Sequence, residues 1–190
     1  MNAPKFAIVV GHTAEAPGAH AIAPLNMYEY EYNKGLADLL SAALMDLSIL
    51  SKTFLRDNVG ILGAYREVNE YEPIGVVELH FNAANGQAWG TETLFVPKDQ
   101  QSGHLAHIMQ SYICGAFNRR GLQDRGWQVV TSDDRGHINL IQAKCPSILT
   151  EPFFGDNAID ATLGYTQKNE LALSMAQAIS IFIKQVQTKN

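Results

Sequence analysis

Apolar residues recur along the chain with the two periods that distinguish strands from helices. Phe6 to Val10 form a short continuous apolar run that ends at Gly11, which is typical of a strand buried on both faces. From Glu29 onward, leucines and alanines recur every three or four residues, which is the pattern of a helix with one apolar face. The members of this stripe are Leu36, Leu39, Leu40, Ala43, Leu44 and Leu47. The N-terminal part of the chain therefore predicts a strand followed by a helix.

The same two patterns continue toward the C-terminus. They predict strands at 49–55, 75–81, 91–96 and 147–150, and helices at 61–72, 105–117 and 172–186. Residues 121–139 show neither period and are predicted to be irregular. Strands that alternate with helices indicate a single α/β domain over residues 1–190, with a mostly parallel or mixed sheet and helices on both faces.

Composition and charge exclude several classes of protein. The 190 residues are 46% apolar and 17% charged, which is typical of one compact domain and not of a disordered tail. The net charge of -5 gives no basic field for nucleic acid or an anionic membrane. No apolar run reaches the roughly 20 residues needed to cross a bilayer. Cys114 and Cys145 are too few for a framework of several disulfides.

Three of the expected strands end at a side chain that can bind a metal or transfer a proton. His12 follows the first strand, His80 lies near the end of the strand at 75–81, and Glu151 follows the strand at 147–150. Ligand sites in such sheets gather beyond the carboxyl ends of the strands, so these side chains should converge. Two imidazoles and a carboxylate suit catalytic zinc, which keeps a fourth position for water. The sequence has neither HExxH nor a CxxC pair, so this site must be assembled from distant segments.

Other titratable side chains compete for these roles. Glu29 and Glu31 stand at the start of one helix, and two positions apart they cannot both face one metal. Glu78 shares a strand face with His80, so it is either a rival carboxylate or a buried, ion-paired structural group. The further candidates, each with a loop or solvated role as its alternative, are His20, His104, His107 and His137.

Four fragments of the chain stand in an order that resembles one family. They are Ile8 to His12 with Pro17-Gly18-Ala19, Glu29 to Asn33, Leu79 to Ala83 followed by Gly90 to Thr93, and Pro146 to Glu151 with Asn157. These fragments resemble the Gly-His turn, the Glu-x-x-x-Asn helix start, the Ile-His-Ala-Asn-Ala segment and the closing Pro-x-x-Leu-x-Glu motif of the zinc-dependent N-acetylmuramoyl-L-alanine amidases of the amidase 3 type. That family occurs in bacterial wall remodelling and in phage lysins.

The resemblance implies a set of site residues and a substrate. It implies that His12, Glu29 and His80 bind one zinc ion per chain. Glu151 would be the catalytic carboxylate, and we expect Asn82 to contact the substrate. The implied substrate is peptidoglycan or a muramoyl-peptide, cleaved at the amide between N-acetylmuramic acid and L-alanine of the stem peptide.

Two features depart from the family's pattern. The glycines that usually follow the first histidine are replaced by Thr13 to Ala16, and the serine that commonly precedes the Ile-His pair is Glu78. The alternatives are a zinc carboxypeptidase or a deacylase of N-acyl amino acids, for which the substrate carboxylate needs a cation, and a non-catalytic wall-binding module. The candidate cations are Arg56, Arg66 and Arg135.

The N-terminal residues lack the pattern of a secretion signal. We expect a monomer without a separate wall-binding domain and without nucleic-acid or membrane partners. It would be made in the cytoplasm without a signal peptide and would act on the cell wall, as an endolysin does after phage-type release.

Overall fold

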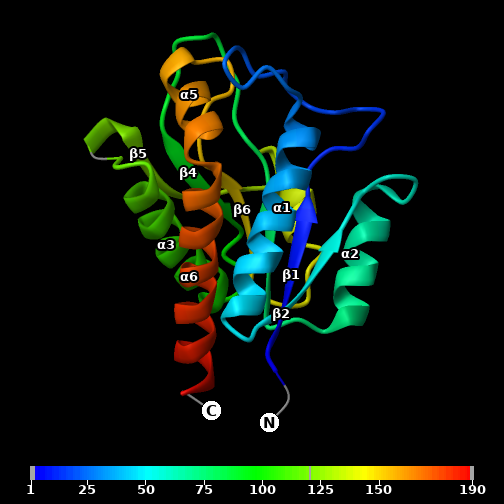
Figure 1. The fold of residues 1–190 in the computed structure, drawn as a ribbon. Helices are drawn as coiled ribbons and strands as arrows, with labels where there is room; N and C mark the ends of the chain where they lie inside the picture. Colours follow the sequence, from blue (N-terminus) through cyan, green and yellow to red (C-terminus); the bar gives the residue numbers. More distant parts are fainter. Residues whose placement is uncertain (1–2, 120, 189–190) are drawn as a thin grey trace.

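The computed structural model describes residues 3–119 and 121–188, and a six-stranded sheet forms its centre (Figure 1). The strands are β1 (Lys5–Val10), β2 (Leu50–Phe54), β3 (Gly75–Leu79), β4 (Thr91–Phe95), β5 (Asp124–Val129) and β6 (Ser147–Glu151). Their order is β2-β1-β3-β6-β4-β5. The first four in this order are parallel, β4 is antiparallel to β6, and β5 is parallel to β4. The expected mixed α/β sheet is therefore confirmed.

Helices cover both faces of this sheet. They are α1 (Glu29–Asp46), α2 (Gly60–Tyr71), α3 (Gln100–Ala116), α4 (His137–Leu140), α5 (Ala158–Thr166) and α6 (Lys168–Gln187), with a short 3-10 helix at Gly121–Gln123. Phe6, Ile8 and Val10 of β1 pack in the core beneath α1, α3 and α6, whereas Ala7 and Val9 pack against α2 on the other face. Side chains alternate across a strand, and β1 is apolar throughout because both its faces are covered.

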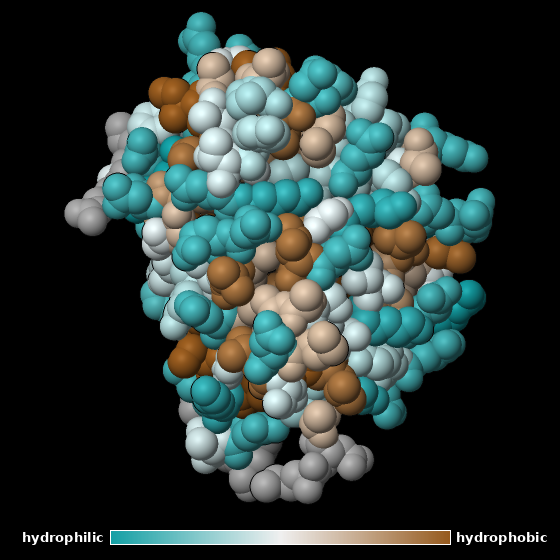
Figure 2. All heavy atoms as spheres, viewed as in Figure 1, coloured by the Kyte–Doolittle hydropathy of each residue, from teal (hydrophilic) through white to brown (hydrophobic). Residues whose placement is uncertain are grey.

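The outer face formed by α1 and α6 is mixed in polarity. Hydrophobic side chains lie there in small groups separated by hydrophilic ones (Figure 2). Among the described residues, no helix combines the length and the apolar character that spanning a bilayer requires.

The prediction of an irregular stretch at 121–139 is wrong in part. β5 occupies six of these residues, and α4 begins at His137. β5 lies at one edge of the sheet and most of its side chains are exposed, so no apolar pattern marks it in the sequence. Its conformation is set by backbone pairing with β4.

Helix α5 was not predicted either. Asn157 caps it, because its Oδ1 accepts hydrogen bonds from the backbone N–H groups of Ile159 and Asp160. Residues 1, 2, 120, 189 and 190 of the expected domain lie outside the described residues.

Candidate metal centre

The chain enters the site through a strained turn after β1. His12 has a φ of 65°, in the left-handed region that is uncommon for residues other than glycine. Its Nε2 lies 3.1 Å from Oε2 of Glu29. Two glycines leave room here: a Cβ on Gly11 would lie 2.3 Å from Cε1 of His80, and a Cβ on Gly18 would lie 2.6 Å from Oε2 of Glu29. Larger residues at either position would displace the metal-binding candidates.

Glu29 lies in the first turn of α1, with its carboxylate between two imidazoles. Its Oε1 is 2.8 Å from Nδ1 of His80, and its Oε2 faces His12. The backbone N–H groups of Ala19 and Phe81 donate to the same carboxylate, at 3.3 and 3.1 Å. These contacts on both oxygens fix its orientation.

The choice between Glu29 and Glu31 follows from their positions on α1. Glu29 is 3% exposed, whereas Glu31 lies at the surface. Oε2 of Glu31 accepts a hydrogen bond from the backbone N–H of Tyr28 at 3.4 Å, which caps the start of the helix. Glu29 therefore faces the histidines, and Glu31 stabilises the helix end.

The three side chains form a cluster with the chemistry of a zinc site. One ligand atom each from His12, Glu29 and His80 lie within 4.8 Å of one another. Burial raises the pKa of Glu29, but hydrogen bonds with the two histidines outweigh it and bring the pKa to about 2. Burial lowers the pKa of His80, but Glu29 and Glu78 raise it to about 10. Both shifts have one cause, the pairing of carboxylates with imidazoles within the cluster. Two imidazoles and one carboxylate form a known donor set of catalytic zinc, so the residues fit this ion.

Glu151 ends β6 at the same edge of the sheet. Its Oε2 is buried and has no hydrogen-bond partner among the described residues. Burial raises the pKa of Glu151 to about 8; the charge of His80 opposes this shift, and Glu29, Glu92 and Glu78 add to it. A buried carboxyl group with a pKa near neutral is suited to proton transfer.

A cleft of about 540 Å³ brings these groups together. His12, Glu29, His80 and Glu151 all line it, as do Asn82 and Arg135. The sequence-predicted metal ligands and the predicted catalytic carboxylate therefore share one cleft.

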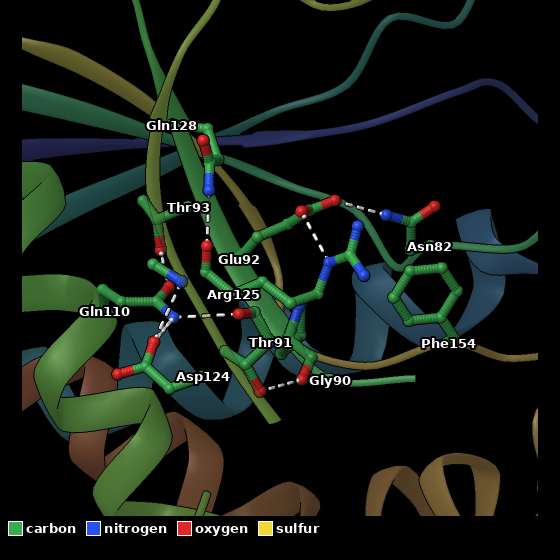
Figure 3. Close-up of polar contacts among 12 residues, drawn as sticks. Asn82, Gly90, Thr91, Glu92, Thr93, Gln110, Asp124, Arg125, Gln128 and Phe154 are labelled. Atoms are coloured by element: carbon green, nitrogen blue, oxygen red, sulfur yellow. Dashed lines mark hydrogen bonds and ion pairs between the residues drawn. The ribbon is translucent and has the colours of Figure 1, made fainter. Parts of the chain in front are cut away.

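Asn82 is oriented by contacts within the protein (Figure 3). Its Nδ2 donates to Oε1 of Glu92 at 2.6 Å, and Oε2 of Glu92 accepts from Nε of Arg125 at 2.8 Å. The guanidinium of Arg125 lies 5.1 Å from the centre of the Phe154 ring. Oδ1 of Asn82 accepts from the backbone N–H of Ala83. The expected contact between Asn82 and substrate stays a prediction.

Glu78 is fully buried and is not among the side chains that line the cleft. Its Oε1 pairs with Nη1 of Arg56 at 2.5 Å and lies 3.0 Å from Nε2 of His80. Burial raises its pKa, but His80 and Arg56 outweigh burial and bring it to about 2. Glu78 is therefore ionised and engaged, and Glu151 is the carboxyl group better placed to accept a proton.

The other histidines take structural positions. His20 packs edge-on against Tyr28 with the ring centres 4.7 Å apart, and His107 packs in the same way against Trp127 at 4.5 Å. His104 contacts the side chain of Gln185, and His137 starts α4. In the described part of the chain, none of them joins the cluster of His12, Glu29 and His80.

A mixed α/β sheet with a buried carboxyl group and a His-Glu-His cluster in one cleft has the features of a hydrolase site whose side chains could hold a metal ion. The family model described as N-acetylmuramoyl-L-alanine amidase matches residues 7–185, and the chain belongs to this family. It is therefore an amidase of peptidoglycan.

Solved structures show the same fold. The catalytic domain of the N-acetylmuramoyl-L-alanine amidase CwlV from Bacillus (Paenibacillus) polymyxa var. colistinus has a TM-score of 0.76 at 20% identity, over 97% of this chain and 98% of that one. An N-acetylmuramoyl-L-alanine amidase from Clostridium difficile 630 has a TM-score of 0.80 at 22% identity, over 100% of both chains. The catalytic domain of the CD27L endolysin, which targets Clostridia difficile, has a TM-score of 0.77 at 22% identity, over 93% and 96%. A search of the curated proteins gave no match.

Proposed function

We propose that this amidase uses one zinc ion, held by His12, Glu29 and His80, to hydrolyse the amide between N-acetylmuramic acid and L-alanine of the stem peptide. The observation that carries this proposal is the convergence of three ligand atoms within 4.8 Å in the cleft that also holds Glu151. All of these residues belong to one chain, which supports a catalytic unit that is complete in a monomer.

The groups in the cleft would have separate roles in the reaction. Bound zinc would polarise the amide carbonyl and lower the pKa of the attacking water toward about 7. Glu151 would accept the proton of that water at a carboxylate oxygen and deliver it to the nitrogen of the departing amine. Its raised pKa suits the delivery of the proton, and a cation held beside it would favour the ionised form that accepts the proton. Asn82, held by Glu92, would orient the substrate at the rim of the cleft.

The carboxypeptidase and deacylase alternatives need a cation for the substrate carboxylate. Arg56 is engaged with Glu78, whereas Arg135 lies exposed and lines the cleft. Membership of the amidase family favours the muramoyl amide as the scissile bond. A wall-binding module without catalysis would leave the unpartnered carboxyl group of Glu151 without a role.

Mass spectrometry of a muramoyl-peptide distinguishes these functions. The peptide is incubated with the protein as prepared, after chelation, and after zinc is added back. We expect an intact stem peptide with a free N-terminal L-alanine, lost on chelation and restored by zinc. Release of terminal residues only would identify a carboxypeptidase, and the absence of any zinc-dependent product would contradict the proposal.

A further inference from the structure

Glu78 is a fully buried carboxylate that the proposed reaction does not use. It stands two positions before His80 on the same face of the chain, and its Oε1 lies 3.0 Å from Nε2 of that imidazole. Its other oxygen accepts a hydrogen bond from the hydroxyl of Tyr65 on α2 at 2.7 Å. A buried charge is costly unless it is paired and hydrogen-bonded, so this placement calls for a physical reason.

Two further donors fix the carboxylate in place. Nη1 of Arg56, from the loop after β2, donates to Oε1 of Glu78 at 2.5 Å, and Nδ2 of Asn139 on α4 donates to the same atom at 2.8 Å. The side chain of Arg56 is 12% exposed, so the opposite charge is itself largely withdrawn from water. Contacts from three separate elements thus prevent the carboxylate from rotating away from His80.

The two nitrogens of His80 face different carboxylates. Nδ1 lies 2.8 Å from Glu29, a proposed metal ligand, and Nε2 faces Glu78. The carboxylate of Glu78 is held by three other donors and accepts from Nε2, so that nitrogen carries a proton. Without metal, Nδ1 donates its proton to Glu29 in the same way, and a metal bound at Nδ1 would take the place of that proton. Carboxylate partners of this kind fix the tautomer and ring orientation of metal-binding histidines and raise their basicity.

We infer that Glu78 is a positioning residue, which holds His80 in the Nε2–H tautomer with Nδ1 directed at the metal. This inference rests on the proposed zinc site. Arg56, Tyr65 and Asn139 act through Glu78 and hold its carboxylate against the imidazole.

Zinc affinity measured by competition with a chromophoric chelator tests the inference without reference to turnover. Serine is too short to reach the imidazole, so E78S should bind zinc about 10–100-fold more weakly than the wild type. Glutamine keeps an acceptor oxygen but not the charge, so E78Q should show a smaller loss, about tenfold. E78Q also keeps the shape of the side chain. If circular dichroism shows that E78S does not fold, the zinc affinity of E78Q tests the inference.

Asp160 provides a matched control. It is fully buried, pairs with Arg119, and accepts hydrogen bonds from the backbone N–H groups of Gly90 and Phe154. D160N should lose stability as E78Q does, because both variants leave a buried arginine without its counter-charge. Its zinc affinity should equal that of the wild type.

Proton NMR of the cobalt(II)-substituted protein gives a signature of the tautomer itself. The ring N–H of His80 should appear as a shifted, slowly exchanging signal in the wild type and D160N, and should exchange faster in E78S and E78Q. Wild-type zinc affinity and slow exchange in folded E78 variants would overturn the inference and leave the proposed function standing. A wild-type protein that neither binds zinc nor releases the stem peptide would overturn the proposed function itself.

Discussion

Glu151 has a buried carboxylate oxygen without a hydrogen-bond partner among the described residues, and we expect this group to transfer protons in catalysis. E151Q should keep its zinc, because the residue is not one of the clustered ligands, and its kcat should fall about 10²–10⁴-fold, the usual contribution of a general acid–base group. H80A should lose both zinc and turnover. Zinc content by elemental analysis and the rate of muramoyl-peptide cleavage check both variants. Near-normal turnover of E151Q would show that another group takes the proton.

The same carboxyl group makes the stability of the metal-free protein depend on pH. The pKa of Glu151 is about 8 when folded against an ordinary value of 4.5, so the folded state keeps a proton that the unfolded chain loses. This contribution is fully present below pH 4.5 and is lost as the pH rises through 8. We expect the chelated wild type to lose up to about 4 kcal/mol of unfolding free energy relative to E151Q over this window. Urea titrations of both proteins at pH 5 and pH 8 measure this change. An equal difference in unfolding free energy between wild type and E151Q at the two pH values would contradict the prediction.

Sequence patterns reveal the metal-binding candidates but not the side chains that support them. His12, His80 and Glu151 could be predicted because each lies at or just after the end of a recognisable apolar strand. The contacts of Glu78 with Tyr65 and Asn139 join a strand to two helices at sequence separations of 13 and 61 residues. Only tertiary packing brings these groups together, so no local pattern marks them.

Among the elements, the paired ends of β1 and β3 govern the space around the metal site. The backbone N–H of Gly11 donates to the carbonyl of Leu79 at 3.0 Å, which places Gly11 directly beside His80. G11A would put a methyl group 2.3 Å from the present position of the His80 ring, so the imidazole must move. We expect zinc affinity to fall at least about tenfold, since misplaced ligands weaken metal binding on the scale seen for lost supporting contacts. Chelator competition measures this loss.

Gly115 is the matched control for that substitution. It lies within α3, and a Cβ there would meet nothing within 4 Å. G115A should bind zinc as the wild type does and gain up to about 1 kcal/mol, because alanine favours the helix over glycine. Equal zinc affinity in G11A and G115A would show that the ring of His80 has room to adjust.

The elements that could be predicted are those with a buried apolar face. The periodic stripes of α1, α3 and α6 and the apolar run of β1 were all confirmed, because their burial dictates their composition. β5 escaped prediction because its side chains are mostly exposed, so that backbone pairing with β4 forms the strand and no apolar run marks it. α5 is short, and its signal was the cap at Asn157 and not an apolar stripe.

At the scale of the whole molecule, the proposed metal site joins segments that lie far apart in the chain. His12 follows β1, Glu29 starts α1 and His80 follows β3, so the three proposed ligands meet only in the folded protein. An unfolded chain offers no such preformed site, and the free energy of zinc binding therefore adds to the free energy of folding.

Thermal unfolding should accordingly report zinc directly. At free zinc about 100-fold above its Kd, linkage adds about 2.7 kcal/mol, which for a domain of this size corresponds to a rise in Tm of about 5–10 °C over the chelated protein. Calorimetry at fixed pH with a zinc buffer measures the rise, and magnesium, which prefers oxygen ligands, should give none. H80A should show no zinc-dependent rise, because two remaining ligands hold the ion too weakly. If zinc raised the Tm of H80A as much as that of the wild type, zinc would be stabilising the protein from a different site. The cluster at the ends of β1 and β3 would then not be the zinc site.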